Sequence, residues 1–200
     1  MGSPIDMERG LTNGLQRQEE KGQVKILHVG CGGSPLPDLW KGWEEIRFDA
    51  DPQCGADLVG DMLDIPMDDD SVDAVYTSHT LEHVTYHDGV RALREFRRVL
   101  KPGGMALVIV PNVGALGEYI SSGRLYDTLY DSPGGKVCAA DMIWGHQGLI
   151  ERDKGERAYR FAHRFGYTPE TLSGAFKAAG FTNVKATVFH EWDAAATGTK

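Results

Sequence analysis

The sequence contains little cysteine, little positive charge and no long apolar segment. Its three cysteines, Cys31, Cys54 and Cys138, are too few and too scattered for a disulfide framework, which is typical of a reducing compartment. The longest strongly apolar run, residues 105–110, is far too short to span a bilayer. The N-terminus carries neither the apolar core of a signal peptide nor a myristoylation pattern. We therefore expect a cytoplasmic protein that does not act in a membrane.

Positive charge is scarce because 21 lysines and arginines stand against 29 acidic residues, a formal net charge of −8. Nucleic acid is therefore not expected as the main partner, since binding its phosphates needs a basic surface. Apolar residues make up 41% of the chain, as in an ordinary globular protein. We expect a flexible polar arm over residues 1–22, followed by one domain over residues 23–200.

Short apolar segments alternate with helical patterns along this domain. One helix is expected over residues 88–100, with Asp88 as its N-cap, and a second begins at Thr168 and Pro169 and ends at Gly180. The alternation predicts an α/β fold with a parallel sheet. Strands are expected near residues 24–29, 45–49, 56–59, 72–77, 106–110 and 181–189, with a weaker candidate over 192–200.

Residues 112–167 interrupt this alternation. The segment carries many glycines and aromatic residues and is too long for a simple connection. It follows a strand, and ligands of α/β sheets bind beyond the carboxyl ends of the strands. We expect it to be an insertion that forms a lid over that edge of the sheet.

The strongest local signal is a glycine-rich turn over residues 28–35, directly after the first strand. Glycines there allow a tight turn and a close approach of the backbone to a ligand. Asp49, at the end of the next strand, can accept both hydroxyl protons of a ribose, and residues 60–63 after the third strand offer a purine an acceptor, an N–H and an apolar face. Pro35 stands at the sixth place of G-x-G-x-x-G, so the nicotinamide fingerprint fails.

The series continues with Leu81-Glu82-His83 and with Leu100-Lys101-Pro102-Gly103-Gly104. Over residues 24–111 the chain resembles the class I S-adenosylmethionine-dependent methyltransferases of the small soluble type. The resemblance implies a Rossmann-like, doubly wound, mostly parallel sheet of seven strands, with helices on both faces and one antiparallel strand near the C-terminus. It also implies transfer of a methyl group from S-adenosyl-L-methionine to a small-molecule acceptor, with S-adenosyl-L-homocysteine as product.

The resemblance also implies which residues bind the cofactor. Two positions depart from the family pattern: His28 stands where an acid is usual and Ser34 where a glycine is usual. A partner protein that binds the cofactor without catalysis therefore stays open as an alternative. The expected cofactor contacts follow the strands and are His28, Gly30, Cys31, Gly32, Asp49, Ala50, Asp61, Met62, Ser78 and His79.

Methyl transfer from a sulfonium is an in-line displacement that needs alignment and exclusion of water. A base is needed only when the acceptor is a protonated hydroxyl or amine. The candidate bases are His79, His83, His146 and His163, and His79, His146 and His163 are the ones expected to be catalytic. The expected acceptor pocket lies in the insertion and consists of Tyr119, Trp144, His146 and Gln147. The identity of the acceptor and the oligomeric state stay open at this point.

A zinc hydrolase is a further alternative. His79-Thr80-Leu81-Glu82-His83 matches the inverted zinc-protease motif H-x-x-E-H, in which two histidines on a helix bind zinc beside a glutamate base. This alternative needs a third ligand that the sequence does not identify, and it leaves the glycine turn and Asp49 unexplained. We therefore expect no metal.

Overall fold

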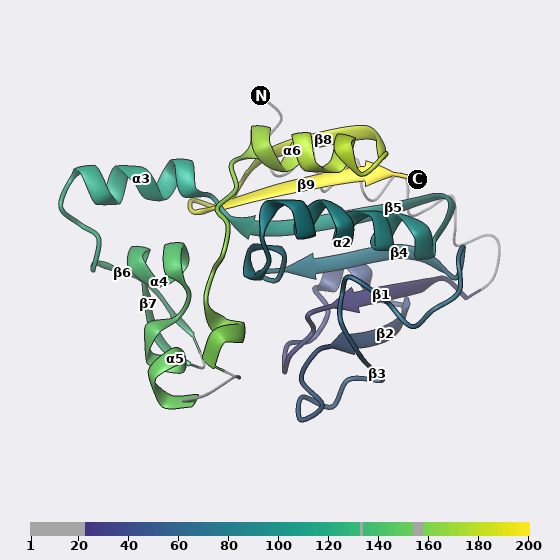
Figure 1. The fold of residues 1–200 in the computed structure, drawn as a ribbon, viewed down its shortest axis with the longest axis horizontal. Helices are drawn as coiled ribbons and strands as arrows, with labels where there is room; N and C mark the ends of the chain where they lie inside the picture. The colour runs from purple at the N-terminus through teal and green to yellow at the C-terminus, as the bar shows by residue number, and fades with distance from the viewer. Residues whose placement is uncertain (1–22, 133, 154–157) are drawn as a thin grey trace.

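The computed structural model describes residues 23–132, 134–153 and 158–200. A seven-stranded sheet in the order β3-β2-β1-β4-β5-β9-β8 forms its centre (Figure 1). β9 pairs antiparallel with both of its neighbours, and the other neighbouring strands pair in parallel. This confirms the mostly parallel sheet with one antiparallel strand near the C-terminus. The strands are β1 (Lys25–Val29), β2 (Glu44–Asp49), β3 (Leu58–Val59), β4 (Val72–Ser78), β5 (Leu100–Pro111), β8 (Thr182–Phe189) and β9 (Asp193–Thr199).

Two helices, α2 (Tyr86–Val99) and α6 (Pro169–Ala178), cover one face of the sheet (Figure 1). Leu93 and Phe96 of α2 and Phe176 of α6 are fully buried in the main hydrophobic core. They pack there with alternate residues of the strands, such as Leu27 and Val29, because successive strand residues point to opposite faces. Fully burying each such side chain contributes about 1.5–3 kcal/mol to stability.

The opposite face carries a second, smaller core. In the described part of the chain the segment that covers it includes the short 3-10 helix η2 (Asp38–Trp40). The indole of Trp40 is buried against Tyr76 of β4, with 6.3 Å between the ring centroids, and Ile26 of β1 joins the same cluster. The predicted flexible arm over residues 1–22 lies outside the described residues.

The two long helices begin at hydroxyl caps. The prediction that Asp88 caps α2 is wrong: the cap is Thr85, whose Oγ1 accepts from the backbone N–H of Asp88 at 3.3 Å. Asp88 lies one turn inside, where its carboxylate accepts from the Thr85 hydroxyl at 2.9 Å. The cap of α6 is Thr168, with Pro169 in the first turn, as the sequence predicts. Gly180, with φ of +92°, follows the end of α6.

The weak last strand is fully formed. β9 pairs with β5 from Asp193 to Thr199, and β8 flanks it on the other side. Ala194, Ala195 and Ala196 are completely buried between these neighbours. Alanine has a low strand propensity, which explains why the sequence signal is weak even though the strand is paired on both sides.

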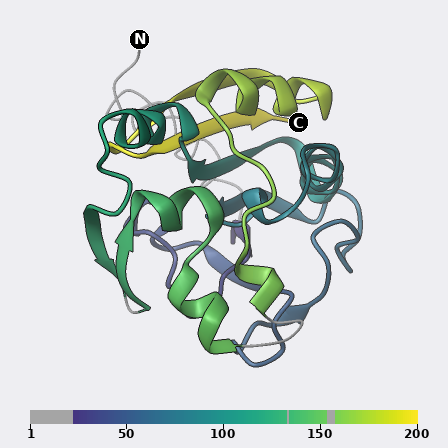
Figure 2. The same ribbon diagram turned by 60° about the vertical axis from the view of Figure 1, so that its left-hand side comes forward.

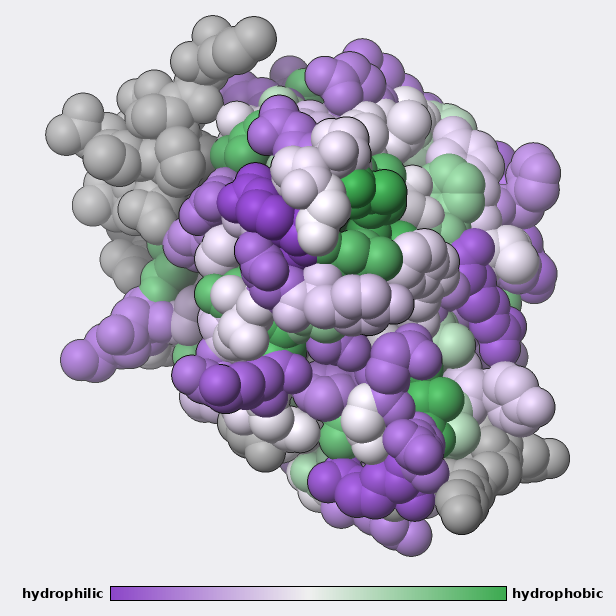
Figure 3. Space-filling model, turned by 90° about the vertical axis from the view of Figure 1, so that its left-hand side faces the viewer, coloured by the Kyte–Doolittle hydropathy of each residue, from purple (hydrophilic) through white to green (hydrophobic). Residues whose placement is uncertain are grey.

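The segment between β5 and α6 forms an additional layer at the carboxyl ends of the strands (Figures 1 and 2). It has a small core of its own, built around Leu116, Val137 and Met142. On this face, apolar side chains form small groups among polar ones (Figure 3). No helix in the described ranges is long and apolar enough to cross a membrane. The elements of this layer are α3 (Val113–Ser121), β6 (Thr128–Ser132), β7 (Gly135–Cys138), α4 (Ala139–Trp144), α5 (Gln147–Asp153) and the 3-10 helix η4 (Ala158–Phe161).

Candidate active site

A cavity of about 680 Å³ lies at the carboxyl ends of β1, β2, β3 and β4. Its volume falls in the range of about 300–1,000 Å³ that is usual for small-molecule sites. Four groups of lining residues come from the turns that follow the four strands, and a fifth comes from the inserted layer. The strand turns contribute Gly30, Gly32, Asp49, Ala50, Asp51, Cys54, Gly60, Asp61, Met62, His79, Thr80 and His83, and the insertion contributes Tyr159, Arg160, Phe161 and Arg164.

The glycine turn after β1 requires its first glycine. Gly30 has φ of +68°, in the left-handed region, and its N–H donates to the carbonyl oxygen of Phe48 on β2 at 2.9 Å. A Cβ at Gly30 would overlap the side chain of Thr80, which follows β4. Only a residue without a side chain lets the turns after β1 and β4 approach so closely.

Asp49 lies at the end of β2 and faces this turn. One of its carboxylate oxygens accepts from the N–H of Gly32 at 2.8 Å, and the other accepts from the N–H of Asp51 at 2.8 Å. These two bonds fix the orientation of the side chain at the wall of the cavity. Because a carboxylate has about four acceptor positions, room remains for two hydroxyl donors from a ligand.

Arg47 holds the glycine turn from the other side. Its guanidinium donates to the carbonyl oxygens of Gly32 at 2.7 Å and Ser34 at 3.0 Å, and to the Glu45 carboxylate at 3.1 Å. The two bonds to carbonyl oxygens fix the backbone of the turn in place. No feature of the sequence pattern points to this role of Arg47.

His28 does not line the cavity, although the resemblance implies a cofactor contact there. Leu27 and Val29 lie in the main core, so His28 points to the opposite face, where it is buried against Tyr76. Its Nδ1 lies 2.7 Å from the Glu45 carboxylate. Burial lowers the pKa of His28, although the nearby Glu45 opposes this shift. A neutral imidazole that donates its Nδ1 proton to Glu45 fits this geometry.

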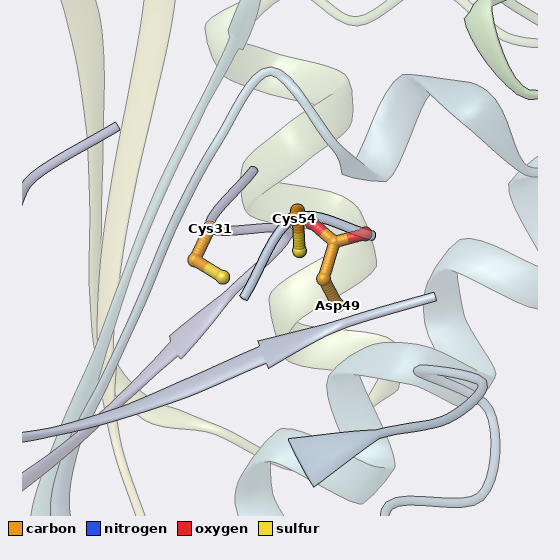
Figure 4. A group of neighbouring side chains, drawn as sticks. All are labelled: Cys31, Asp49 and Cys54. Atoms are coloured by element: carbon orange, nitrogen blue, oxygen red, sulfur yellow. The ribbon is translucent and has the colours of Figure 1, made fainter. Parts of the chain in front are cut away.

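Cys31 and Cys54 lie close to Asp49 (Figure 4). The two sulfur atoms and a carboxylate oxygen of Asp49 all lie within 4.8 Å of one another. Cys31 is buried behind the glycine turn, and burial raises the pKa of its thiol to about 11. Cys54 lines the cavity itself, a position that the sequence does not indicate.

Asp61 and Met62 line the cavity beyond Asp49, as does Phe48. The Asp61 carboxylate accepts from the N–H of Leu63 at 2.9 Å, which fixes it in the turn after β3. Met62 and Phe48 supply apolar surface beside it. A polar acceptor next to apolar walls suits a flat heterocycle with an amino group. Ser78 is not among the lining residues, whereas the adjacent His79 is.

His79 lies in a strained turn between two carboxylates. Its φ is +53°, its Nε2 lies 3.4 Å from Asp193 and its Nδ1 lies 3.7 Å from Glu82. Burial lowers its pKa, but the two carboxylates outweigh burial and the pKa is raised overall. The structure does not form the helix that the H-x-x-E-H motif needs, because residues 81–83 make only the 3-10 turn η3 (Leu81–His83). His79 also points to Asp193 rather than sharing a helix face with His83.

The four residues predicted to form the acceptor pocket do not line the cavity. Tyr119 belongs to the separate core of the insertion, where its hydroxyl accepts from the Trp192 indole at 2.9 Å. Trp144 is 50% exposed. Gln147 is exposed, and its side chain donates to the carbonyl of Gly145. His146 Nδ1 accepts from the N–H of Leu149 at 3.4 Å, so the ring bonds to the first turn of the helix that follows it.

The insertion reaches the cavity through a different segment, residues 158–165. The Arg160 guanidinium donates to the carbonyl of Ala50 at 3.0 Å and so joins the insertion to the turn after β2. Tyr159, Phe161 and Arg164 also line the cavity, and Tyr159 is 70% exposed. The only sequence signal for them is an alternation of basic and aromatic residues. His163 is turned away from the lining, toward Glu82, with Nε2 3.9 Å from a carboxylate oxygen.

The sequence of this chain is similar to those of known proteins. Residues 27–108 match the family model described as a methyltransferase domain. A demethylmenaquinone methyltransferase of Staphylococcus carnosus is 31% identical over 133 residues, which are 65% of this chain and 48% of that protein. The mitochondrial 2-methoxy-6-polyprenyl-1,4-benzoquinol methylase of Mus musculus is 40% identical over 98 residues, 47% of this chain and 28% of that protein. The chain thus spans half or less of the length of these curated relatives.

Solved structures agree in fold. A SAM-dependent methyltransferase from Archaeoglobus fulgidus superposes with a TM-score of 0.61 at 17% identity, over 100% of this chain and 95% of the other. An S-adenosylmethionine-dependent methyltransferase from Mesorhizobium loti superposes with a TM-score of 0.57 at 16% identity, over 100% and 99% of the two chains. The likeness therefore extends across the inserted layer as well as the sheet.

The Gly30 contact yields a prediction about stability. The Gly30→Ala substitution places a Cβ in the left-handed region and against Thr80. We expect the free energy of unfolding to fall by about 1–3 kcal/mol, the usual cost of such strain. Urea denaturation measures it. Gly33→Ala is the matched control, because a Cβ there meets nothing within 4 Å, and it should change stability by less than about 0.5 kcal/mol. Equal losses in the two variants would contradict the steric argument.

Proposed function

We propose that this chain, which carries a class I S-adenosylmethionine-dependent methyltransferase domain, transfers the methyl group of S-adenosyl-L-methionine to a small-molecule acceptor. The observation that carries the proposal is the cavity at the carboxyl ends of β1, β2, β3 and β4. It brings together the glycine turn, a fixed carboxylate and an apolar wall with a second carboxylate. A nucleoside with an amino-acid side chain presents matching groups in the same order.

Each part of the cofactor has a counterpart among these residues. The backbone of Gly30 and Gly32 leaves space for the methionyl chain, and the free acceptor positions of Asp49 take the two ribose hydroxyls. Such charge-assisted hydrogen bonds contribute about 1.5–3 kcal/mol. Asp61 accepts from the amino group of adenine, whose ring lies against Met62. Ala50 and Cys54 complete the wall around the ribose.

The acceptor end of the cavity is formed by His79, His83, Tyr159, Phe161 and Arg164. When bound, the cofactor supplies a methyl group already activated by the positive sulfonium. The tasks left to the protein are to align the acceptor with that methyl group and to keep water out. Phe161 and Tyr159 supply apolar surface for an acceptor. His79 is placed to take a proton from a hydroxyl or amine acceptor.

Small phenols and quinols are the proposed class of acceptor. The names of two relatives refer to quinone-type acceptors, and the aromatic side chains at this end suit a flat ring. The experiment incubates the chain with S-adenosylmethionine and a panel of quinols, phenols, amines and thiols. Production of S-adenosylhomocysteine above the rate without acceptor supports the proposal. Cofactor binding without product across the whole panel would favour a non-catalytic cofactor-binding partner.

The ribose assignment yields a prediction. Asp49→Ala should weaken S-adenosylmethionine binding at least tenfold, equivalent to about 1.4 kcal/mol, because both hydroxyl contacts and the bond to Gly32 are lost. Isothermal titration calorimetry measures the affinity. Asp68→Ala removes a carboxylate on the exposed surface and should bind like the parent chain. An unchanged affinity in Asp49→Ala would remove Asp49 from the ribose site.

The cysteines provide an independent probe of the same pocket. Cys54 lines the cavity, whereas Cys138 lies in the insertion and outside the lining. S-adenosylhomocysteine should slow the alkylation of Cys54 by iodoacetamide at least tenfold and leave Cys138 unchanged. Cys31 should react slowly at neutral pH in either state, since its raised pKa keeps it protonated. Peptide mass spectrometry reads each site, and equal protection of Cys54 and Cys138 would argue against the pocket.

A further inference from the structure

Glu82 is buried in a way that the proposed transfer does not explain. Only 1% of its surface is exposed, and neither carboxylate oxygen has a hydrogen-bond partner among the described residues. A buried carboxylate normally has a cation or several donors to compensate for the loss of water. The nearest nitrogens, Nδ1 of His79 and Nε2 of His163, lie 3.7 and 3.9 Å from Oε1, beyond hydrogen-bond length.

Two histidines next to this carboxylate are held as metal ligands usually are. His163 Nδ1 lies 2.9 Å from the carbonyl oxygen of Met142, and His83 Nδ1 lies 3.3 Å from that of Ala162. A carbonyl only accepts, so each ring donates there from Nδ1 and keeps a lone pair on Nε2. This contact to a carbonyl is the usual way in which proteins orient a metal-binding imidazole.

The three side chains are also close enough to share one ion. One ligand atom from each of Glu82, His83 and His163 lies within 4.8 Å of the other two, and the two imidazole rings meet edge to face at 4.8 Å between centroids. Metal bonds of about 2.0–2.2 Å in a tetrahedral site place ligand atoms roughly 3.3–3.6 Å apart. The set closes to that spacing if the three side chains move toward one another.

We propose that Glu82, His83 and His163 bind a divalent transition-metal ion, with zinc as the ion that best suits two imidazoles and one carboxylate. Three protein ligands leave a fourth position open, as in catalytic zinc sites. His83 also lines the cavity, so the proposed ion would lie next to the acceptor end. The site differs from the H-x-x-E-H arrangement, because His163 of the insertion supplies the ligand and His79 remains directed at Asp193.

One consequence rests on the proposed methyl transfer. A hydroxyl or thiol acceptor bound at the open position would have a lowered pKa. Its proton passes to His79 or to solvent, the acceptor atom forms a bond to the methyl carbon, and the bond from that carbon to sulfur breaks. The metal is unchanged at the end of this step.

The experiment titrates the chelator-treated chain with Co²⁺, whose visible absorption reports its ligands, and then displaces Co²⁺ with Zn²⁺. We expect one Co²⁺ per chain, and at least a tenfold loss of affinity in Glu82→Gln, His83→Asn and His163→Ala. His87→Ala is the matched control, because His87 is an exposed histidine at the start of α2, and it should bind Co²⁺ like the parent chain. Far-UV circular dichroism and S-adenosylhomocysteine binding check that each variant is folded.

Two results would overturn the metal site. One is the absence of stoichiometric Co²⁺ binding to the parent chain. The other is binding that survives in His163→Ala but is lost in Cys54→Ser, with the intense absorption of a thiolate ligand, which would move the ion to Cys31, Asp49 and Cys54. The titration needs no methyl acceptor, so its result does not depend on whether the proposed methyl transfer occurs. Co²⁺ binding with no turnover would count against the proposed function alone.

Discussion

The close contact between Gly30 and Thr80 is the constraint on which the rest of the site depends. β1 and β4 are parallel neighbours at the centre of the sheet, so their carboxyl-terminal turns meet side by side. A side chain at Gly30 would separate them. Their contact sets the glycine turn against Asp49 on one side, and it fixes the start of the segment that carries His79, Glu82 and His83 on the other. The absence of a side chain at Gly30 thus determines the spacing between the two ends of the cavity.

Glu82 connects the sheet to the inserted layer. Its backbone carbonyl accepts from the N–H groups of Arg164 at 2.8 Å and Phe165 at 3.2 Å. The same residue turns its carboxylate inward, toward His163 of the segment that its carbonyl holds. The position of the basic and aromatic wall of the cavity is therefore coupled to the turn after β4. A change in what the Glu82 carboxylate binds would therefore shift the position of residues 158–165.

The sequence predicts the sheet, the glycine turn and Asp49 because each has a local cause: strand patterning, backbone freedom and position after a strand. The opposite orientation of His28 was also accessible to such reasoning, since Leu27 and Val29 are both core residues and a strand alternates its faces. The sequence does not identify the cap at Thr85, because Asp88 and Thr85 both suit a helix start and only the backbone geometry separates them.

The insertion was the least predictable part. Its short elements carry no long period, and its contact with the cavity depends on tertiary bonds such as that of Arg160 to Ala50. Their aromatic character makes Trp144 and Tyr119 candidates for an acceptor pocket, but this character alone does not distinguish a local core from a ligand wall. Tyr119 serves the local core, whereas Tyr159 and Phe161 face the cavity. No local rule applied to single residues separates these two outcomes.

The charges of the cavity are divided between its two ends. Asp49 and Asp61 lie at the end assigned to the nucleoside, where their fixed oxygens accept from hydroxyl and amino donors. His79, His83 and Arg164 lie at the other end, together with the guanidinium of Arg160. The guanidinium groups of Arg160 and Arg164, placed beside a partly closed cavity, stabilise an anionic oxygen or sulfur more than its protonated form. Since the anion is the better nucleophile toward a sulfonium methyl group, this division favours acceptors that ionise on binding over those that stay neutral.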